Sequence, residues 1–272
     1  MCELFAMSSR HAATVNFSLE EFSRHGGLTG PHRDGWGIAY YAGADVRLIK
    51  EPDAASESDC VRFIEAHDIR SPTVISHNRR ATRGGRSLAN TQPFCRELGG
   101  RMHVFAHNGD LPDIARQPGL RLGRFRPIGA TDSEHAFCAL LAKLEALWLS
   151  DQGPPSLPDR LRIVAPFAAM LRGLGPANFL YCDSEVLFAH AHVRRHEGRA
   201  GLHPPALHVL QRSCPVEPEP VSAPGLSIRS AAEPQDVVLF ASVPLTGESW
   251  VPLREGEILA AANGRILELI DS

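Results

Sequence analysis

Cysteine is scarce in this sequence and widely scattered. Six cysteines occur among 272 residues, and even the closest pair, Cys182 and Cys214, is well separated along the chain. That separation excludes the CxxC motifs of zinc sites and thiol redox centres. We expect most of the cysteines to be reduced and structural.

An excess of positive charge is also absent, as are long apolar runs. The 28 basic and 31 acidic residues give a net charge of −3, which excludes a general basic field for nucleic acid. Arg80, Arg83 and Arg86 lack the interleaved aromatic residues of single-strand binders. No apolar run approaches the roughly 18 residues of a membrane helix, and the first residues do not resemble a signal peptide. We therefore predict a cytoplasmic protein that binds neither nucleic acid nor a membrane.

The length and composition are typical of a globular protein with a substantial core. Hydrophobic residues make up 43% and charged residues 22% of the chain. Neither an internal repeat nor a convincing linker interrupts it. We predict a single domain over residues 1–272, with a proline-rich surface excursion at about 203–225.

Short β-type runs bounded by turn residues occur in both halves of the chain, with helices between them. The predicted strands cover residues 3–7, 35–41, 46–49, 73–77, 102–106, 178–182, 186–190, 236–242, 250–253, 258–262 and 266–269. Four helices are predicted. The first begins at Ser18, the second covers 57–67, the third begins at Thr131 with a capping box that uses Glu134, and the fourth covers 158–172. Asn263-Gly264 predicts a hairpin. This order predicts an α+β fold with helices packed outside sheet.

The position of Cys2 has a chemical consequence. Removal of Met1, which the small second residue favours, would leave a thiol and a free α-amine on one residue. An α-amine has a pKa near 7.7–8.0, about the value needed in a general base at neutral pH. Together the two groups would form the amino-terminal variant of a nucleophile with its base. The alternative is a small residue at the start of a buried strand.

Several further motifs follow Cys2 along the chain. They are His-Arg-Asp-Gly-Trp-Gly at 32–37, Ser-His-Asn-Arg-Arg-Ala-Thr-Arg-Gly at 76–84, Asn-Thr-Gln-Pro-Phe at 90–94, His-Asn-Gly-Asp at 107–110, Thr-Asp-Ser-Glu at 131–134 and Ala-Ser-Val-Pro-Leu at 241–245. With the Met-Cys-Glu-Leu-Phe start, this set resembles the class II glutamine amidotransferases, specifically their stand-alone YafJ-like members. These are N-terminal-nucleophile (Ntn) hydrolases that begin with Cys. The resemblance spans nearly the whole chain and implies a four-layer αββα sandwich, with two sheets face to face and helices outside.

The resemblance assigns an oxyanion hole to Asn108 and Gly109. A side-chain amide and a backbone N–H on one tight turn can converge on a single oxygen, as attack on an amide carbonyl requires. The alternative for an Asn-Gly pair is an ordinary type I′ turn.

The resemblance also implies the residues that hold the substrate. Arg79 would bind the α-carboxylate of a glutamyl group, and Asp132 would accept from its α-ammonium. Without the resemblance, Asp132 would be interpreted as a favourable charge at a helix N-terminus, and Arg79 would be interpreted as a solvated surface residue. His77 and Thr82 match the family's loop motif on the substrate side of the cleft. Trp36, between two glycines, is a further substrate-site candidate, with strand packing as its alternative.

The thirteen histidines raise the question of a metal site. His190 and His192 would share one face of a strand, and His103 and His107 lie close together in sequence. No HExxH motif or carboxylate-flanked cluster accompanies them, so we predict neither a metal nor a cofactor. A metal-dependent hydrolase remains a third alternative.

These observations predict attack of the Cys2 thiolate on a γ-glutamyl amide, a thioester intermediate, and release of ammonia or an amine. The sequence leaves open whether the protein is an amidotransferase that supplies ammonia to a separate partner, a glutaminase or a γ-glutamyl peptide hydrolase. Another alternative is a non-catalytic amino-acid-binding protein that retains Met1. The sequence does not indicate the oligomeric state.

Overall fold

The computed structural model of the chain describes residues 2–14, 24–67, 69–81, 84–150, 153–196, 198–214, 221–223, 226–228 and 234–272. Met1, Thr82 and most of the helix predicted to begin at Ser18 lie outside these residues. Within the described ranges, no helix is both long and apolar enough to cross a membrane.

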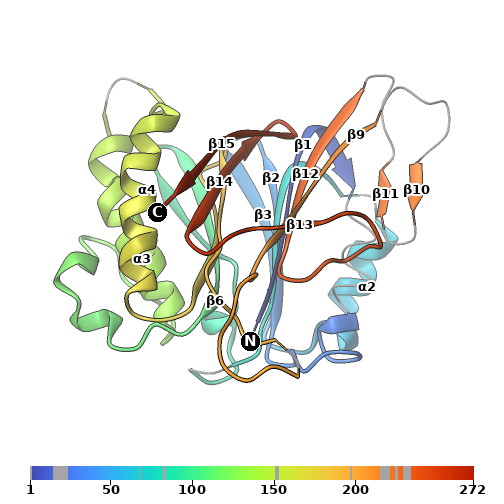
Figure 1. Cartoon of the computed structure of the whole chain (residues 1–272), viewed down its shortest axis with the longest axis horizontal. Coiled ribbons are helices and arrows are strands. Elements are labelled where there is room, and N and C mark those ends of the chain that lie inside the picture. The colour runs from blue at the N-terminus through green and yellow to red at the C-terminus, as the bar shows by residue number, and fades with distance from the viewer. Residues whose placement is uncertain are drawn as a thin grey trace.

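Two antiparallel sheets form the centre of the molecule (Figure 1). The larger sheet has the order β13-β9-β12-β1-β4-β2-β3, and the smaller sheet has the order β15-β14-β8-β7-β6-β5. The strands of the larger sheet are β1 (Glu3–Thr14), β2 (Trp36–Ala42), β3 (Asp45–Glu51), β4 (Arg70–Asn78), β9 (His208–Cys214), β12 (Gln235–Ala241) and β13 (Val251–Pro252). Those of the smaller sheet are β5 (Phe94–Leu98), β6 (Arg101–Gly109), β7 (Ala177–Cys182), β8 (Leu187–His190), β14 (Glu257–Ala262) and β15 (Arg265–Asp271). A separate hairpin pairs β10 (Val221–Ala223) with β11 (Leu226–Ile228).

Helices cover the outer faces of both sheets. Figure 1 shows α3 and α4 on one side of the sheets and α2 on the other. Their bounds are α2 (Asp59–Ala66), α3 (Asp132–Trp148) and α4 (Leu157–Arg172). The described residues also include the 3-10 turns η1 (Ala55–Glu57), η2 (Leu88–Asn90), η3 (Ile114–Arg116) and η4 (Pro118–Leu120).

Strand β1 explains how the layers are held together. Its side chains alternate between faces, and both faces are buried in the first part of the strand, where residues 4–7 form a continuous apolar run. Phe5 and Met7 join the core beneath α2, whereas Leu4 and Ala6 join the core between the sheets. A third core lies between the smaller sheet and α3 with α4. Helix, sheet, sheet and helix pair thus form the αββα sandwich predicted from the sequence, which is confirmed.

The start of α3 differs in detail from the predicted capping box. Thr131 Oγ1 accepts from the Glu134 backbone N–H at 3.2 Å, as the motif requires. The Glu134 carboxylate instead accepts from the backbone N–H groups of Ile128 at 3.0 Å and Gly129 at 2.7 Å. It also pairs with Arg96 of β5. Glu134 thereby connects the segment that precedes α3 to the edge strand β5 of the smaller sheet.

Four of the described strands differ from the sequence prediction. β5 and β11 were not predicted, and β9 and β10 lie inside the segment predicted to be a surface excursion. Val209 and Leu210 of β9 are buried, and the strand pairs with β12 along its whole length. The prolines flank this strand rather than interrupt it, which is compatible with sheet pairing.

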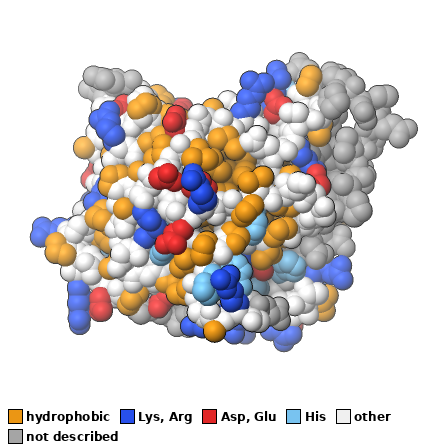
Figure 2. All heavy atoms as spheres, viewed as in Figure 1, with side chains coloured by type: hydrophobic (Ala, Val, Ile, Leu, Met, Phe, Trp, Pro, Cys, Tyr) orange, Lys and Arg blue, Asp and Glu red, His pale blue; other side chains and the backbone are white. Residues whose placement is uncertain are grey.

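The hairpin predicted at Asn263-Gly264 joins β14 to β15. Both turn residues have positive φ, 50° and 74°, as a type I′ turn requires. β15 is an edge strand that exposes Leu267 and Leu269. Figure 2 shows hydrophobic side chains gathered over β14 and β15 on this face.

Candidate active site

Cys2 lies immediately before β1, where the amino end of this strand meets the end of β4. The backbone N–H of Arg80 donates to the Cys2 Sγ at 3.2 Å, and the thiol can donate to the Arg80 carbonyl at 3.3 Å. Asn108 Nδ2 donates to the Cys2 carbonyl at 2.5 Å. Cys2 is therefore held by two segments that are far apart in the sequence, through its sulfur on one side and its backbone carbonyl on the other.

The environment of the thiol favours its neutral form. Burial, the largest effect, raises the pKa of Cys2 above its ordinary value, and the nearby Asp132 carboxylate adds to the rise. The Arg80 backbone and the Arg79 guanidinium lower the pKa, but by less. A neutral thiol is a weak nucleophile, so this cysteine needs a base close by in order to react at neutral pH.

Asn108 and Gly109 end strand β6 and pair with Asn178 and Ala177 of β7. They do not form a turn, so both the tight turn expected for the oxyanion hole and the type I′ alternative are wrong. A Cβ at Gly109 would lie 1.7 Å from the Pro176 carbonyl oxygen, so glycine is required here by close approach rather than by a positive φ.

Asn178 fixes Asn108 from the neighbouring strand. Its Nδ2 donates to the Asn108 carbonyl at 3.0 Å and to the Val193 carbonyl at 2.9 Å. Its Oδ1 accepts from the His192 N–H at 2.7 Å. Sequence reasoning missed this residue, although a polar side chain inside an otherwise apolar strand was a visible signal.

Arg79 is 3% exposed and lies close enough to Cys2 to influence its charge. Its guanidinium donates to the backbone carbonyls of Asp34 at 3.2 Å, Gly84 at 3.1 Å and Gly85 at 3.3 Å. The guanidinium therefore orders the loop after β4 as well as bringing a positive charge beside the thiol. The interpretation as a solvated surface arginine is wrong, because the side chain is buried.

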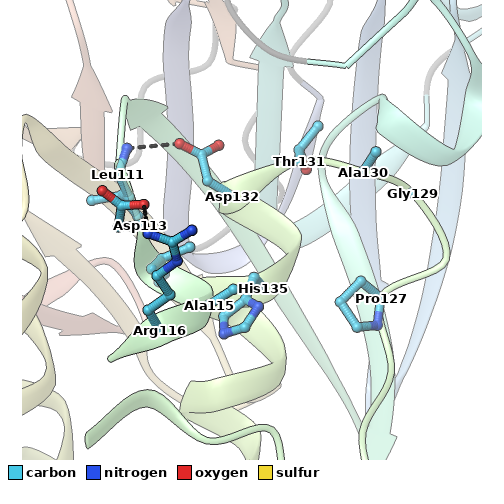
Figure 3. Close-up of a pocket in the computed structure, with 11 residues that line it drawn as sticks. Leu111, Asp113, Ala115, Arg116, Pro127, Gly129, Ala130, Thr131, Asp132 and His135 are labelled. Atoms are coloured by element: carbon cyan, nitrogen blue, oxygen red, sulfur yellow. Dashed lines mark hydrogen bonds and ion pairs between the residues drawn. The ribbon is translucent and has the colours of Figure 1, made fainter. Parts of the chain in front are cut away.

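Asp132 is the first residue of α3, as its sequence position predicts. Its Oδ2 accepts from the Leu111 N–H at 2.7 Å, and its Oδ1 accepts from the Ser133 N–H at 2.8 Å. Figure 3 shows the carboxylate directed at Leu111, above a cavity of about 400 Å³ that His135 and Arg116 also line. Cys2, Arg79 and Asn108 are not among the residues that line this cavity.

His77 lies inside the molecule rather than at the surface of the site. It is fully buried on β4, paired with Leu4 and Gly37 of the neighbouring strands. Because opposite residues in a sheet point to the same face, its side chain lies with that of Leu4 between the two sheets. Burial lowers the pKa of His77 to about 3, so the ring is neutral.

Trp36 belongs to the core beneath α2 and is 1% exposed. Its indole N–H donates to the Glu51 carboxylate at 3.2 Å. Strand packing, the alternative to a substrate contact, describes this placement. Thr82, the remaining predicted substrate residue, lies outside the described part of the chain.

The motif at 90–94 supports the site through two side chains. Gln92 pairs with the backbone of His107, accepting at 2.6 Å and donating at 3.1 Å, directly before Asn108. Asn90 accepts from the Ala130 N–H at 2.8 Å and donates to the Gly85 carbonyl at 2.9 Å. These contacts join the start of α3, the loop after β4 and the end of β6, so the motifs scattered in sequence form one connected unit.

The motif at 241–245 is connected to the nucleophile in a similar way. Ser242 Oγ accepts from the Leu4 N–H at 3.0 Å, and the Ser242 N–H donates to the Leu4 carbonyl at 3.0 Å. Arg194 donates to the Ser242 carbonyl at 2.7 Å. This pairing anchors the start of β1 and with it Cys2.

Three of the buried histidines form ordinary hydrogen bonds. His103 meets the Tyr181 hydroxyl at 2.7 Å, His107 meets the Ser133 hydroxyl at 2.9 Å, and His190 donates to the Ala177 carbonyl at 2.7 Å. Among the residues that the structure describes, no group of three or more His, Cys, Asp or Glu side chains could hold a metal ion.

The four-layer sandwich, with a cysteine at the start of a central strand and an Asn-Gly pair facing it from the other sheet, has the architecture of the Ntn hydrolases. Comparison with known proteins identifies the family within that class. The family model for class II glutamine amidotransferases matches residues 1–272. The chain belongs to this family.

Individual relatives agree with this assignment. The chain is 36% identical over 261 residues to YafJ of Escherichia coli (strain K12), named as a candidate glutamine amidotransferase, covering 94% of this chain and 96% of that one. It is 33% identical to a similarly named Haemophilus influenzae protein, covering 99% of this chain and 87% of that one.

Solved structures extend the similarity to the fold. A Pseudomonas aeruginosa protein, assigned by prediction as a glutamine amidotransferase, superposes with a TM-score of 0.68 at 32% identity, covering 98% of this chain and 100% of that chain. Glutamine phosphoribosylpyrophosphate amidotransferase from B. subtilis superposes with a TM-score of 0.62 at 16% identity, over 99% of this chain and 49% of that one. At that identity the second similarity concerns the fold alone.

Proposed function

We propose that the protein is a γ-glutamyl amide hydrolase of the glutaminase type, and that Cys2 is its nucleophile after removal of Met1. The observation that carries the proposal is the contact between Asn108 and the Cys2 backbone, which brings an amide donor to the residue that carries the sulfur. Membership of the class II glutamine amidotransferases supports the same substrate class.

The α-amine of Cys2 would act as the general base. Burial raises the pKa of the thiol, so little thiolate forms without a proton acceptor. A free α-amine on the same residue has a pKa near 7.7–8.0 and is held within reach by covalent geometry. An amide nitrogen, as in a chain that retains Met1, has no useful basicity.

Catalysis would proceed in two steps, formation of a thioester and its hydrolysis. The sulfur attacks the δ-carbonyl carbon, the C–S bond forms, and the negative oxygen is stabilised by Asn108 Nδ2 and the Gly109 N–H. The C–N bond then breaks, and the amine leaves with the proton taken from the thiol. In the second step water attacks the thioester, the C–S bond breaks, and glutamate and the free thiol are formed.

The glutamyl head group would lie between opposite charges. Arg79 supplies a cation for the α-carboxylate and Asp132 an anion for the α-ammonium. Both charges act on the Cys2 thiol, and this supports the assignment. The carbonyl contacts of Arg79 keep its guanidinium plane fixed before substrate arrives.

The proposal is tested by producing the chain behind a tag whose proteolytic removal leaves Cys2 as the first residue. Glutamate release from glutamine is measured before and after cleavage, in the parent chain, in Cys2→Ala and in Cys60→Ala as the matched control. Activity should appear only after cleavage, persist in Cys60→Ala and be absent from Cys2→Ala. Activity that survives Cys2→Ala and is lost with a chelator would identify a metal-dependent hydrolase instead.

A further inference from the structure

Paired side-chain contacts join the strand that ends in the Asn-Gly pair to the helix that begins with Asp132. His107 Nδ1 lies 2.9 Å from Ser133 Oγ, and Phe105 stacks on Phe137 with the ring centroids 5.5 Å apart. Residues two apart in a strand share a face, as do residues four apart in a helix, so the contacts repeat along one face of β6 and one face of α3. The start of α3 is therefore held in a defined position on β6.

The contact between His107 and Ser133 is buried, and His107 is fixed on its other side. His107 is 1% exposed and Ser133 is 5% exposed. Gln92 forms two hydrogen bonds with the backbone of His107, whereas His107 Nε2 has no hydrogen-bond partner within the described chain. Burial, the largest effect, lowers the pKa of His107, so the ring is neutral at neutral pH and carries one proton.

Ser133 continues this contact to the carboxylate of Asp132. Ser133 Oγ donates to Asp132 Oδ1 at 3.4 Å, and the Ser133 backbone N–H donates to the same oxygen at 2.8 Å. A hydroxyl group has one proton, so a Ser133 hydroxyl that donates to Asp132 accepts from His107 Nδ1. The negative charge of Asp132 favours this direction, because both protons then point toward the carboxylate.

The hydrogen bonds of Asp132 leave room for a substrate cation at one of its oxygens. A carboxylate oxygen has about two acceptor sites. Oδ1 uses both for Ser133, whereas Oδ2 accepts only from the Leu111 N–H at 2.7 Å among the described residues. Figure 3 shows Asp132 at the first turn of α3 with its carboxylate directed at Leu111. The serine therefore orients the carboxylate, and Oδ2 keeps one acceptor site.

We propose that His107 and Ser133 are positioning residues, which hold the Asp132 carboxylate where the α-ammonium of the substrate binds. The proposal rests on the proposed function, in which Asp132 is the anion for that group. β6 also carries Asn108, so the same contact sets the ammonium site relative to the oxyanion donor. Selectivity for a substrate with a free α-amine then depends on Ser133, without contact between Ser133 and the substrate.

The first experiment compares glutamine with glutaramate, the analogue that lacks only the α-amine. In the processed chain, Ser133→Ala should lower the ratio of kcat/KM for glutamine to kcat/KM for glutaramate by about fivefold or more, the usual effect of one lost hydrogen bond. Most of the change should lie in KM for glutamine. Ser71→Ala deletes another buried hydroxyl, which donates to the Tyr41 carbonyl at 2.8 Å, and should retain the ratio.

Two further comparisons test whether Ser133 acts through its partners. His107→Leu should lower the ratio as Ser133→Ala does, and the two changes together should lower it no further. In an Asp132→Asn background, Ser133→Ala should leave the ratio unchanged, because the carboxylate that the serine orients is gone. A further loss of selectivity in that background overturns the proposal.

Binding of both compounds to the processed Cys2→Ala chain, measured by calorimetry, separates this proposal from the proposed function. A preference for glutamine that Ser133→Ala weakens and Ser71→Ala does not weaken supports the proposal, whatever the turnover. An unchanged preference in Ser133→Ala, equal effects of the two serine changes, or no preference in the Cys2→Ala chain itself overturns it, even if glutamine is hydrolysed. Absence of turnover by the processed parent chain with the binding preference intact refutes only the proposed function.

Discussion

Asn108 Nδ2 donates a 2.5 Å hydrogen bond to the carbonyl oxygen of Cys2, across the interface between the two sheets. The amide of one sheet thus touches the residue that opens the central strand of the other. An amide in this position can bind the oxygen that becomes negative when the neighbouring sulfur attacks a carbonyl.

Asn108→Ala should lower kcat for glutamine hydrolysis by about 10²–10³-fold, the usual loss for one oxyanion donor, with a smaller change in KM. Steady-state kinetics of the processed chain measures this. Asn263→Gly serves as the control, because this remote turn residue has a positive φ that glycine readily adopts. An Asn108→Ala variant with unchanged kcat would exclude the amide from the oxyanion hole.

Gly109→Ala should disturb the pairing of β6 with β7 and reduce both thermal stability and activity. The added Cβ would lie 1.7 Å from the Pro176 carbonyl oxygen, so the backbone must move. Gly247→Ala adds the same methyl group where nothing lies within 4 Å. Thermal unfolding of both variants should show a lower midpoint only for Gly109→Ala; equal midpoints would mean that β6 tolerates a side chain there.

Asp132→Asn should raise KM for glutamine by about tenfold or more, because a neutral amide replaces the anion proposed to bind the α-ammonium. Asp159→Asn, in the first turn of α4, is the matched control for a helix-start carboxylate away from the site. Kinetics with glutamine distinguishes the two. A similar KM in both variants would assign Asp132 a purely structural role at the start of α3.

The free energy of unfolding should decrease as the pH falls below about 6.5. Burial lowers the pKa of His77 and His190 to about 3 and of His103 to about 4, so between these values and about 6.5 protons bind mainly to the unfolded chain. Each histidine contributes on the order of 1 kcal/mol per pH unit. Burial raises the pKa of Asp183 to about 6, and this group acts in the opposite direction between about pH 6 and 4.

Because the three histidines outweigh the one aspartate, urea unfolding should give a lower free energy at pH 5 than at pH 7. Equal or greater stability at pH 5 would show that the histidines are protonated in the folded chain.

The strands that the sequence predicted best are those with an unambiguous apolar pattern. β1 is buried on both faces and β14 meets β15 at an Asn-Gly turn, so local chemistry is decisive in both places. β5 is an edge strand with a mixed Phe-Cys-Arg-Glu-Leu sequence, and β9 lies in a proline-rich part of the sequence. Neither strand therefore shows a clear alternation of apolar and polar residues.

The site was predicted less completely than the fold. Cys2, Asn108 and Arg79 come together, whereas Trp36 does not join them. The strand periodicity indicated this for Trp36: Trp36 and Ile38 are two positions apart, so both side chains point to the face that packs beneath α2.

The contacts of Gln92 and Asn178 could not be predicted from the sequence, for a different reason. Both side chains bind backbone groups of strand β6 or its surroundings, and such bonds follow from tertiary packing rather than from any local pattern.

The central claim is tested most directly by treating the native-processed chain with diazo-oxo-norleucine, a glutamine-like electrophile, and locating the adduct by mass spectrometry of the intact chain and its peptides. The account predicts one adduct on Cys2, formed only in chains that have lost Met1. An adduct on another residue, or none on a chain from which Met1 has been removed, would contradict it.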